Sequence, residues 1–149
     1  MSQQTSNEIE LVEAVTPGWF WAVSAISLLW NLAGAAAFVA QMTMDSSLLP
    51  IAERAFYEAM PDWATAAFAT AVVGGVLGSV ALLLRRRWAF PLLVVSLLGI
   101  LVQISHSLFV SDGIEIFGPA SLILPLLTFS IAVALVRFSR QSAVRGWLK

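Results

Sequence analysis

Four stretches of this 149-residue chain contain no charged side chain, and each is long enough to cross a lipid bilayer as an α-helix. A crossing takes about 20 helical residues at a rise of about 1.5 Å per residue. A charge at the bilayer centre costs at least about 2.5–3.5 kcal/mol, so membrane insertion explains why all nine acidic and eight basic residues avoid these stretches. The predicted spans are residues 19–41, 63–84, 88–109 and 117–135.

The apolar character of these stretches is continuous, which favours helices over the alternating strands of a membrane barrel. The composition points the same way, because 59% of the residues are hydrophobic and 11% are charged. In soluble domains about 45–50% of the residues are apolar and about 25% are charged. The sequence therefore predicts an all-α fold, a single integral membrane bundle of four antiparallel transmembrane helices that spans residues 1–149.

The basic residues predict how this bundle is oriented. Three arginines, residues 85–87, connect spans two and three, and four more basic residues lie in the tail, residues 136–149. An even number of spans places both groups on one side, where they make up seven of the eight basic residues. The positive-inside rule then predicts that both termini are cytoplasmic. The segment before Trp19 has three glutamates and no basic residue, so we expect no secretory signal peptide and a first span kept in the mature protein.

Tryptophan placement fits the same topology. An amphipathic indole ring prefers the headgroup layer. Trp30 is the exception, because it lies deep within span one. The other five are predicted at span ends: Trp19, Trp21, Trp63, Trp88 and Trp147.

Two segments outside the spans have a character of their own. Residues 50–60, between Pro50 and Pro61, place apolar and charged residues on opposite sides, which predicts a short amphipathic helix on the outer face. We interpret it as an interfacial connector, and a lid over a pocket is the alternative. The basic tail, residues 136–149, is interpreted as charge that sets topology, with binding to the anionic inner leaflet as the alternative. The net charge of −1 gives no indication of a nucleic-acid partner.

Small residues in span two predict a close helix contact. Gly74 and Gly78 are four residues apart, and Gly75 and Ser79 form a second stripe beside them. Such a face allows another helix backbone to approach closely. The partner is expected to be another helix of the same bundle, with a homo-oligomer or a membrane-complex partner as the alternative.

Uncharged polar residues within the spans are the candidates for a binding site, since lipid offers them no hydrogen-bond partner. In span three, five residues fall within a sector of about 100° on one helix face: Ser96, Gly99, Gln103, His106 and Ser107. The predicted orientation brings the polar groups of several spans into the outer half of the bilayer. The predicted polar cavity comprises Trp30, Asn31, Gln41, Gln103, His106, Ser121 and Thr128. The competing interpretation is that these groups only join helices, at about 0.6 kcal/mol per contact.

The residues that most chemistry requires are missing from the spans. The chain has no cysteine, and every carboxylate lies in a loop or terminus, so we expect no catalytic residue and no enzyme. His106 is the only histidine, which cannot bind haem from two sides or build a multi-histidine metal site. We therefore expect no cofactor and no metal. A weak outer site formed by His106, Asp112 and Glu115 is the alternative.

Several motifs together resemble a family of small bacterial four-helix inner-membrane proteins. They are Trp30-Asn31-Leu32-Ala33-Gly34, Tyr57-Glu58-Ala59-Met60-Pro61 and Arg145-Gly146-Trp147-Leu148. Members of that family often carry the label "sugar transporter". The resemblance implies a multi-pass protein of the bacterial cytoplasmic membrane, namely a small transporter or permeation subunit for a small polar solute such as a sugar. The alternative is a structural or accessory membrane subunit that transports nothing.

Overall fold

The computed structural model describes residues 15–109 and 113–149, and every regular element within them is a helix. Four helical segments are long and apolar enough to cross a membrane: α2, α4, α5 and the segment Pro119–Val144. The predicted all-helical class is confirmed. In chain order the elements are α2 (Gly18–Thr43), η1 (Ser46–Leu48), α3 (Ile51–Glu58), α4 (Asp62–Leu83), α5 (Ala89–Phe109), α6 (Gly113–Phe117), η2 (Pro119–Leu122) and α7 (Ile123–Val144).

The last span differs most from its predicted bounds of 117–135. It begins as the 3-10 helix η2 and becomes α-helical at Ile123. Pro125 thus lies in the first turn of α7, where backbone N–H groups have no intrahelical acceptor, so it costs the helix no hydrogen bond. α7 then continues to Val144, beyond the apolar run, because charge opposes burial in lipid but does not oppose a helix. Gly146, with φ 73°, follows its end.

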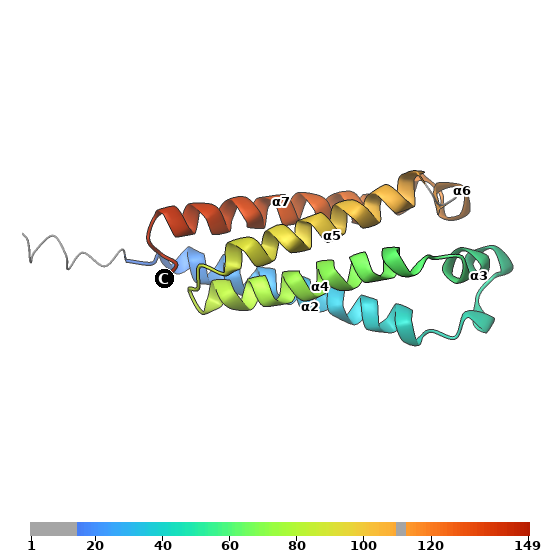
Figure 1. Ribbon diagram of the computed structural model, residues 1–149, viewed down its shortest axis with the longest axis horizontal. Coiled ribbons are helices and arrows are strands. Elements are labelled where there is room, and N and C mark those ends of the chain that lie inside the picture. Colours follow the sequence, from blue (N-terminus) through green and yellow to red (C-terminus); the bar gives the residue numbers. More distant parts are fainter. Residues whose placement is uncertain (1–14, 110–112) are drawn as a thin grey trace, which may run out of the picture.

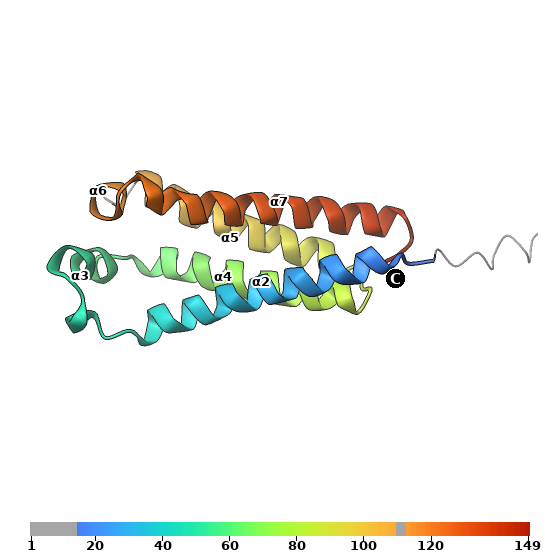
Figure 2. The ribbon, with the colours of Figure 1, turned by 180° about the vertical axis from the view of Figure 1, so that it is seen from behind.

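The helices pack in chain order. α4 packs against both α2 and α5, and α5 packs against α7, so α2 and α7 form the two edges of the arrangement. These edge helices touch near one end, where the Phe138 ring lies 5.7 Å from Trp19 and 5.5 Å from Phe20. That end, which also holds the α4–α5 turn and the C-terminal residues, is called the arginine end below (Figures 1 and 2). The opposite end, with α3 and α6, is called the loop end (Figure 1).

The glycine stripes lie in the interfaces of α4 with its two neighbours. A Cβ atom added to Gly74 would lie 3.0 Å from the Leu92 carbonyl oxygen of α5, and one added to Gly78 would lie 2.7 Å from the Leu93 side chain. From the other side, a Cβ atom on Gly99 would come within 2.7 Å of the Ala67 carbonyl oxygen. The stripes are therefore used for contacts within one protomer.

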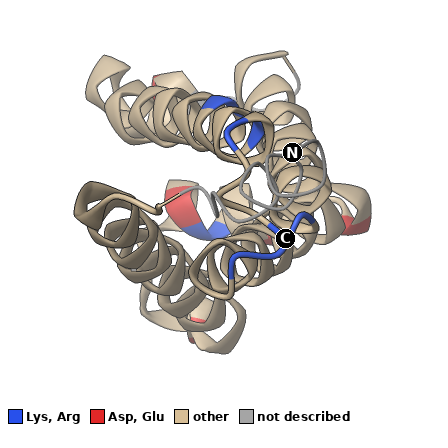
Figure 3. Ribbon diagram, turned by 90° about the vertical axis from the view of Figure 1, so that its left-hand side faces the viewer, with Lys and Arg blue, Asp and Glu red and all other residues tan. Residues whose placement is uncertain are grey.

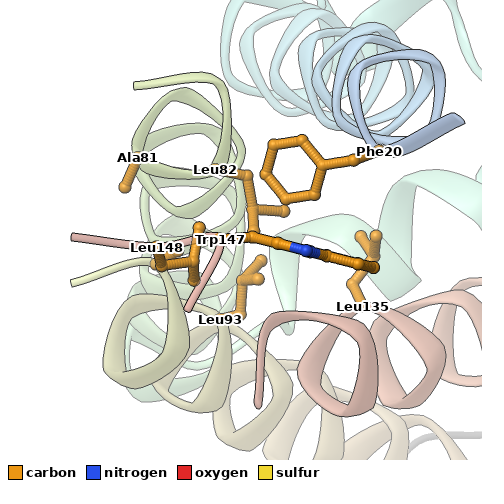
Figure 4. Packing of buried hydrophobic residues seen from close by; sticks show 8 residues of the cluster. Phe20, Ala81, Leu82, Leu93, Leu135, Trp147 and Leu148 are labelled. Atoms are coloured by element: carbon orange, nitrogen blue, oxygen red, sulfur yellow. The ribbon is translucent and has the colours of Figure 1, made fainter. Parts of the chain in front are cut away.

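Hydrophobic residues from all four long helices close the arginine end. We call this cluster the end plug: Phe20, Leu82, Leu93, Leu135, Trp147 and Leu148. In Figure 4 the indole of Trp147 extends between Phe20 and Leu93 toward Leu135. Trp147 is only 8% exposed, so its ring is packed inside the protein and not on the surface of the bundle. The chain turns back after α7 and carries the ring into the bundle, where hydrophobic packing stabilises it.

Backbone hydrogen bonds hold this returning segment against the α4–α5 turn. The Lys149 N–H donates to the Arg85 carbonyl oxygen over 2.6 Å, and the Arg87 N–H donates to the Lys149 carbonyl oxygen over 3.0 Å. The Arg85 Nε–H also donates to the Trp147 carbonyl oxygen over 2.8 Å. The end of the basic tail, residues 136–149, is thus an integral part of the fold.

At the loop end, α3 lies within the predicted segment 50–60 and contacts α6. The Phe117 ring lies 5.2 Å from Phe56 and 6.4 Å from Tyr57. These contacts tie the α2–α4 connection to the α5–α7 connection.

Candidate solute-binding groove

A groove of about 410 Å³ lies between the edge helices α2 and α7, with α4 and α5 at its base. Its volume falls within the range of about 300–1,000 Å³ that is usual for small-molecule sites. Most of its lining is apolar and includes Phe68, Val72 and Ile100. Five lining side chains other than tryptophan carry a polar group: Asn31, Ser96, Gln103, Ser107 and Thr128.

Two of these polar side chains are engaged in contacts between helices. Asn31 Nδ2 donates to the Ser79 hydroxyl oxygen of α4 over 3.0 Å and to the Ser27 carbonyl oxygen over 2.8 Å. The Ser96 hydroxyl of α5 donates to the Ala71 carbonyl oxygen of α4 over 2.6 Å. Both residues therefore contribute more to holding the bundle together than to the chemistry of the groove.

Three other residues that line the groove carry a polar group with no hydrogen-bond partner in the described part of the chain. Within residues 15–109 and 113–149, neither the Trp30 indole N–H, the Gln103 amide nor the Thr128 hydroxyl makes a hydrogen bond. In a hydrocarbon environment each unpaired group of this kind is costly. The groove thus combines apolar walls with unused donors and acceptors from three helices.

The groove ends before it reaches the arginine end. On the side of Trp30 and Thr128 that faces the arginine end lies a separate small space of about 20 Å³, which is bounded by Leu93, Ile131 and Leu135. Leu93 and Leu135 also belong to the end plug. The groove is therefore blocked toward the arginine end.

Of the residues predicted to form one cavity, Trp30, Asn31, Gln103 and Thr128 line the groove, and the other three do not. The first of these three is His106, which is 5% exposed and packs edge-on against Trp63 of α4, with ring centroids 5.1 Å apart. The amide of Gln41 lies 3.5 Å from the Met60 sulfur.

Ser121, the third predicted residue outside the groove, donates to the Gly118 carbonyl oxygen within the same turn, over 2.6 Å.

The residues of the polar stripe of span three face two different neighbours. A sector of about 100° on a helix is wide enough for this. Gly99 and His106 face α4, whereas Gln103 faces the groove.

A row of serines that was not predicted from the sequence precedes Asn31 on the same face of α2. The Ser27 hydroxyl contacts the Ser79 hydroxyl across the α2–α4 interface at 3.2 Å, and the Ser24 hydroxyl donates to the Phe20 carbonyl oxygen. Spacings of three and four residues between Ser24, Ser27 and Asn31 could have revealed it. The apolar residues of the groove could not be found in this way, because apolar residues occur on every face of these spans.

Replacing Ser79 with alanine should destabilise the bundle by about 1 kcal/mol, since it removes two hydrogen bonds between helices at about 0.6 kcal/mol each. Thermal unfolding of the purified protein in detergent micelles would measure the loss. Ser130→Ala is the matched control, because that exposed hydroxyl donates only to a carbonyl of its own helix. Equal effects of the two substitutions would contradict the assigned contact.

Among the described residues no group of three or more histidine and carboxylate side chains could hold a metal ion. Asp112 lies outside the described residues, so the alternative site with His106 and Glu115 stays a prediction.

No protein-family model matches this chain, and neither does any curated protein or any solved structure at a significant level.

Proposed function

We propose that this chain is a multi-pass protein of the bacterial cytoplasmic membrane, with four antiparallel spans and both termini in the cytoplasm. Its four apolar helices support the multi-pass architecture. The positions of the basic residues support the orientation, because the α4–α5 turn, with residues 85–87, and the end of α7 both lie at the arginine end, onto which Figure 3 looks with Lys and Arg in blue. The acidic residues described by the structure belong to the loop end, in or beside α3, α4 and α6. In this orientation the groove lies in the outer half of the bilayer.

The groove binds a small solute, and the chain acts as a small transporter or permeation subunit. The observation that carries this proposal is that the polar groups of Trp30, Gln103 and Thr128 find no hydrogen-bond partner among the residues that the structure describes. A bundle evolved only for packing would gain by replacing such groups with apolar ones. A solute that forms hydrogen bonds with these groups offsets the free-energy cost of leaving them unpaired in the membrane.

The lining also indicates what kind of solute fits. Apolar side chains dominate the walls, and Asn31 is already engaged with Ser79. A molecule with an apolar body and one or two hydrogen-bonding groups matches this surface best. A sugar, which the family resemblance implies, would stack on Trp30 but would present more hydroxyl groups than Gln103 and Thr128 can pair.

Binding can be tested by thermal shift on the purified protein, with one panel of monosaccharides and one of medium-chain alcohols and amides. A bound solute raises the unfolding temperature of the parent. The double substitution Gln103→Leu and Thr128→Val should weaken binding about 30-fold, from about 1 kcal/mol for each lost hydrogen bond. Gln41→Leu with Thr70→Val is the matched control, because neither residue lines the groove.

The accessory alternative makes the opposite prediction. If Gln103 and Thr128 only join helices, the double variant unfolds at a lower temperature than the parent, and no solute stabilises either protein. If Gln103 and Thr128 bind a ligand, the ligand-free double variant is at least as stable as the parent. The reason is that the variant no longer carries these two unpaired polar groups in the membrane.

A further inference from the structure

The end of α7 presents a basic face that takes no part in lining the groove. Arg137, Arg140 and Arg145 share this face with Gln141 and Val144, at spacings of three, four, seven and eight residues from Arg137. Together these side chains line a surface hollow of about 300 Å³. Figure 3 looks onto the arginine end of the molecule, with the positions of Lys and Arg in blue on the ribbon.

The charge of this face is not balanced by acidic neighbours in the part of the chain that the structure describes. The acidic side chains of residues 15–109 and 113–149 lie at the loop end, on the other side of the predicted membrane. Arg137 and Arg140, three residues apart on the helix, repel each other. A bound anion would relieve this repulsion.

One of the three guanidinium groups is held in place by the core. The Arg145 guanidinium lies 5.0 Å from the centroid of the Trp147 ring, which is itself buried in the end plug. A cation stacked on an aromatic ring keeps its N–H groups available along its edge. Arg145 can therefore donate to an anion at a low entropic cost, because its side chain is already positioned.

The same hollow includes an exposed apolar surface. Val144 is 82% exposed and lies among the three arginines. The face also begins two residues after Leu135, the last residue of the predicted span. From Arg137 to Arg145 it extends about 12 Å along the helix axis, which corresponds to the headgroup layer and the adjacent water.

We propose that this arginine face binds the phosphate group of an anionic phospholipid, with Val144 against the glycerol and upper acyl region. Guanidinium groups are suited to phosphate because they present paired N–H donors with a permanent charge. Basic surfaces at the cytoplasmic ends of transmembrane helices gain about a fivefold increase in affinity for anionic lipid per arginine. The site is independent of the groove and of the solute proposed for it.

The test uses the full chain in a neutral detergent, with three probes: short-chain phosphatidylglycerol, short-chain phosphatidylcholine and inorganic phosphate. Phosphatidylglycerol should raise the unfolding temperature of the parent, and added salt should weaken the effect. Arg137→Gln with Arg140→Gln should reduce the apparent affinity for phosphatidylglycerol roughly 30-fold. Since both side chains are exposed and repel each other, the variant should unfold at or slightly above the parent's temperature when no lipid is added.

Arg86→Gln with Arg87→Gln is the matched control, because it removes the same charge from exposed positions at the same end of the molecule. This control should keep the response to phosphatidylglycerol. Equal stabilisation by phosphatidylcholine, or an equal loss of response in the control, would overturn the proposal. If inorganic phosphate stabilised the protein as strongly as phosphatidylglycerol does, the site would be assigned to a soluble phosphate. That result would overturn the proposal of a lipid site.

Discussion

Replacing Trp147 with alanine is expected to lower the free energy of unfolding by about 3–5 kcal/mol, the usual range for truncating a buried aromatic side chain. The indole touches rings from α2, with centroids 5.3 Å from Trp19 and 6.0 Å from Phe20. It also lies in the cluster that joins all four long helices at the arginine end. Thermal or SDS-induced unfolding in mixed micelles would measure the loss.

Trp88→Ala provides the control for this substitution. Trp88 lies at the same end of the molecule and is 74% exposed, so its truncation should cost less than about 1 kcal/mol. Similar losses in the two variants would show that Trp147 is an interfacial ring like the others. Under the proposed function, Trp147→Ala should also let solute leak through reconstituted vesicles, because the end plug blocks the groove on this side.

Gly99→Ala is expected to have the second-largest effect, a loss of about 1–3 kcal/mol from overpacking at the α4–α5 contact. The added Cβ atom would lie 2.7 Å from the Ala67 carbonyl oxygen and 2.8 Å from the Ala71 backbone nitrogen. These are backbone atoms, so the helices themselves must move apart. The separation would also strain the hydrogen bond from Ser96 to Ala71.

Gly34→Ala is the matched control for this substitution. Gly34 lies in the middle of α2, and no atom outside its own helix backbone comes within 4 Å of the position of its added Cβ. There alanine should leave stability unchanged or raise it by up to about 1 kcal/mol, through its higher helix propensity. A loss in both variants, measured by thermal unfolding, would contradict a specific close contact at Gly99.

The helical class and the positions of the long helices could be predicted from the sequence because a single rule governs both. The cost of burying charge confines Arg85 and its neighbours to a turn, and it sets the apolar length that must lie between the turns. α4 and α5 accordingly begin and end within one residue of the predicted spans. Helix bounds outside the apolar region, such as the end of α7, follow no such rule.

The candidate site was predictable only in part, because periodicity gives the direction of a side chain but not what lies opposite it. Gln103 and His106 are three residues apart and share one face in sequence, yet one lines the groove and the other packs against Trp63. Trp147 shows a second limit. Its burial depends on a chain reversal after α7, at Gly146, that composition and hydropathy do not register.

The packing of each long helix against its predecessor in the chain has a consequence for biogenesis. α4, α5 and α7 each contact the long helix that precedes them in the chain, so most of the bundle can assemble through contacts between successive segments. The contact between Phe20 and Trp147 is different, since it joins the beginning of α2 to the segment that follows α7. Docking of this ring therefore takes place only after the first and the last of the four long helices have come together.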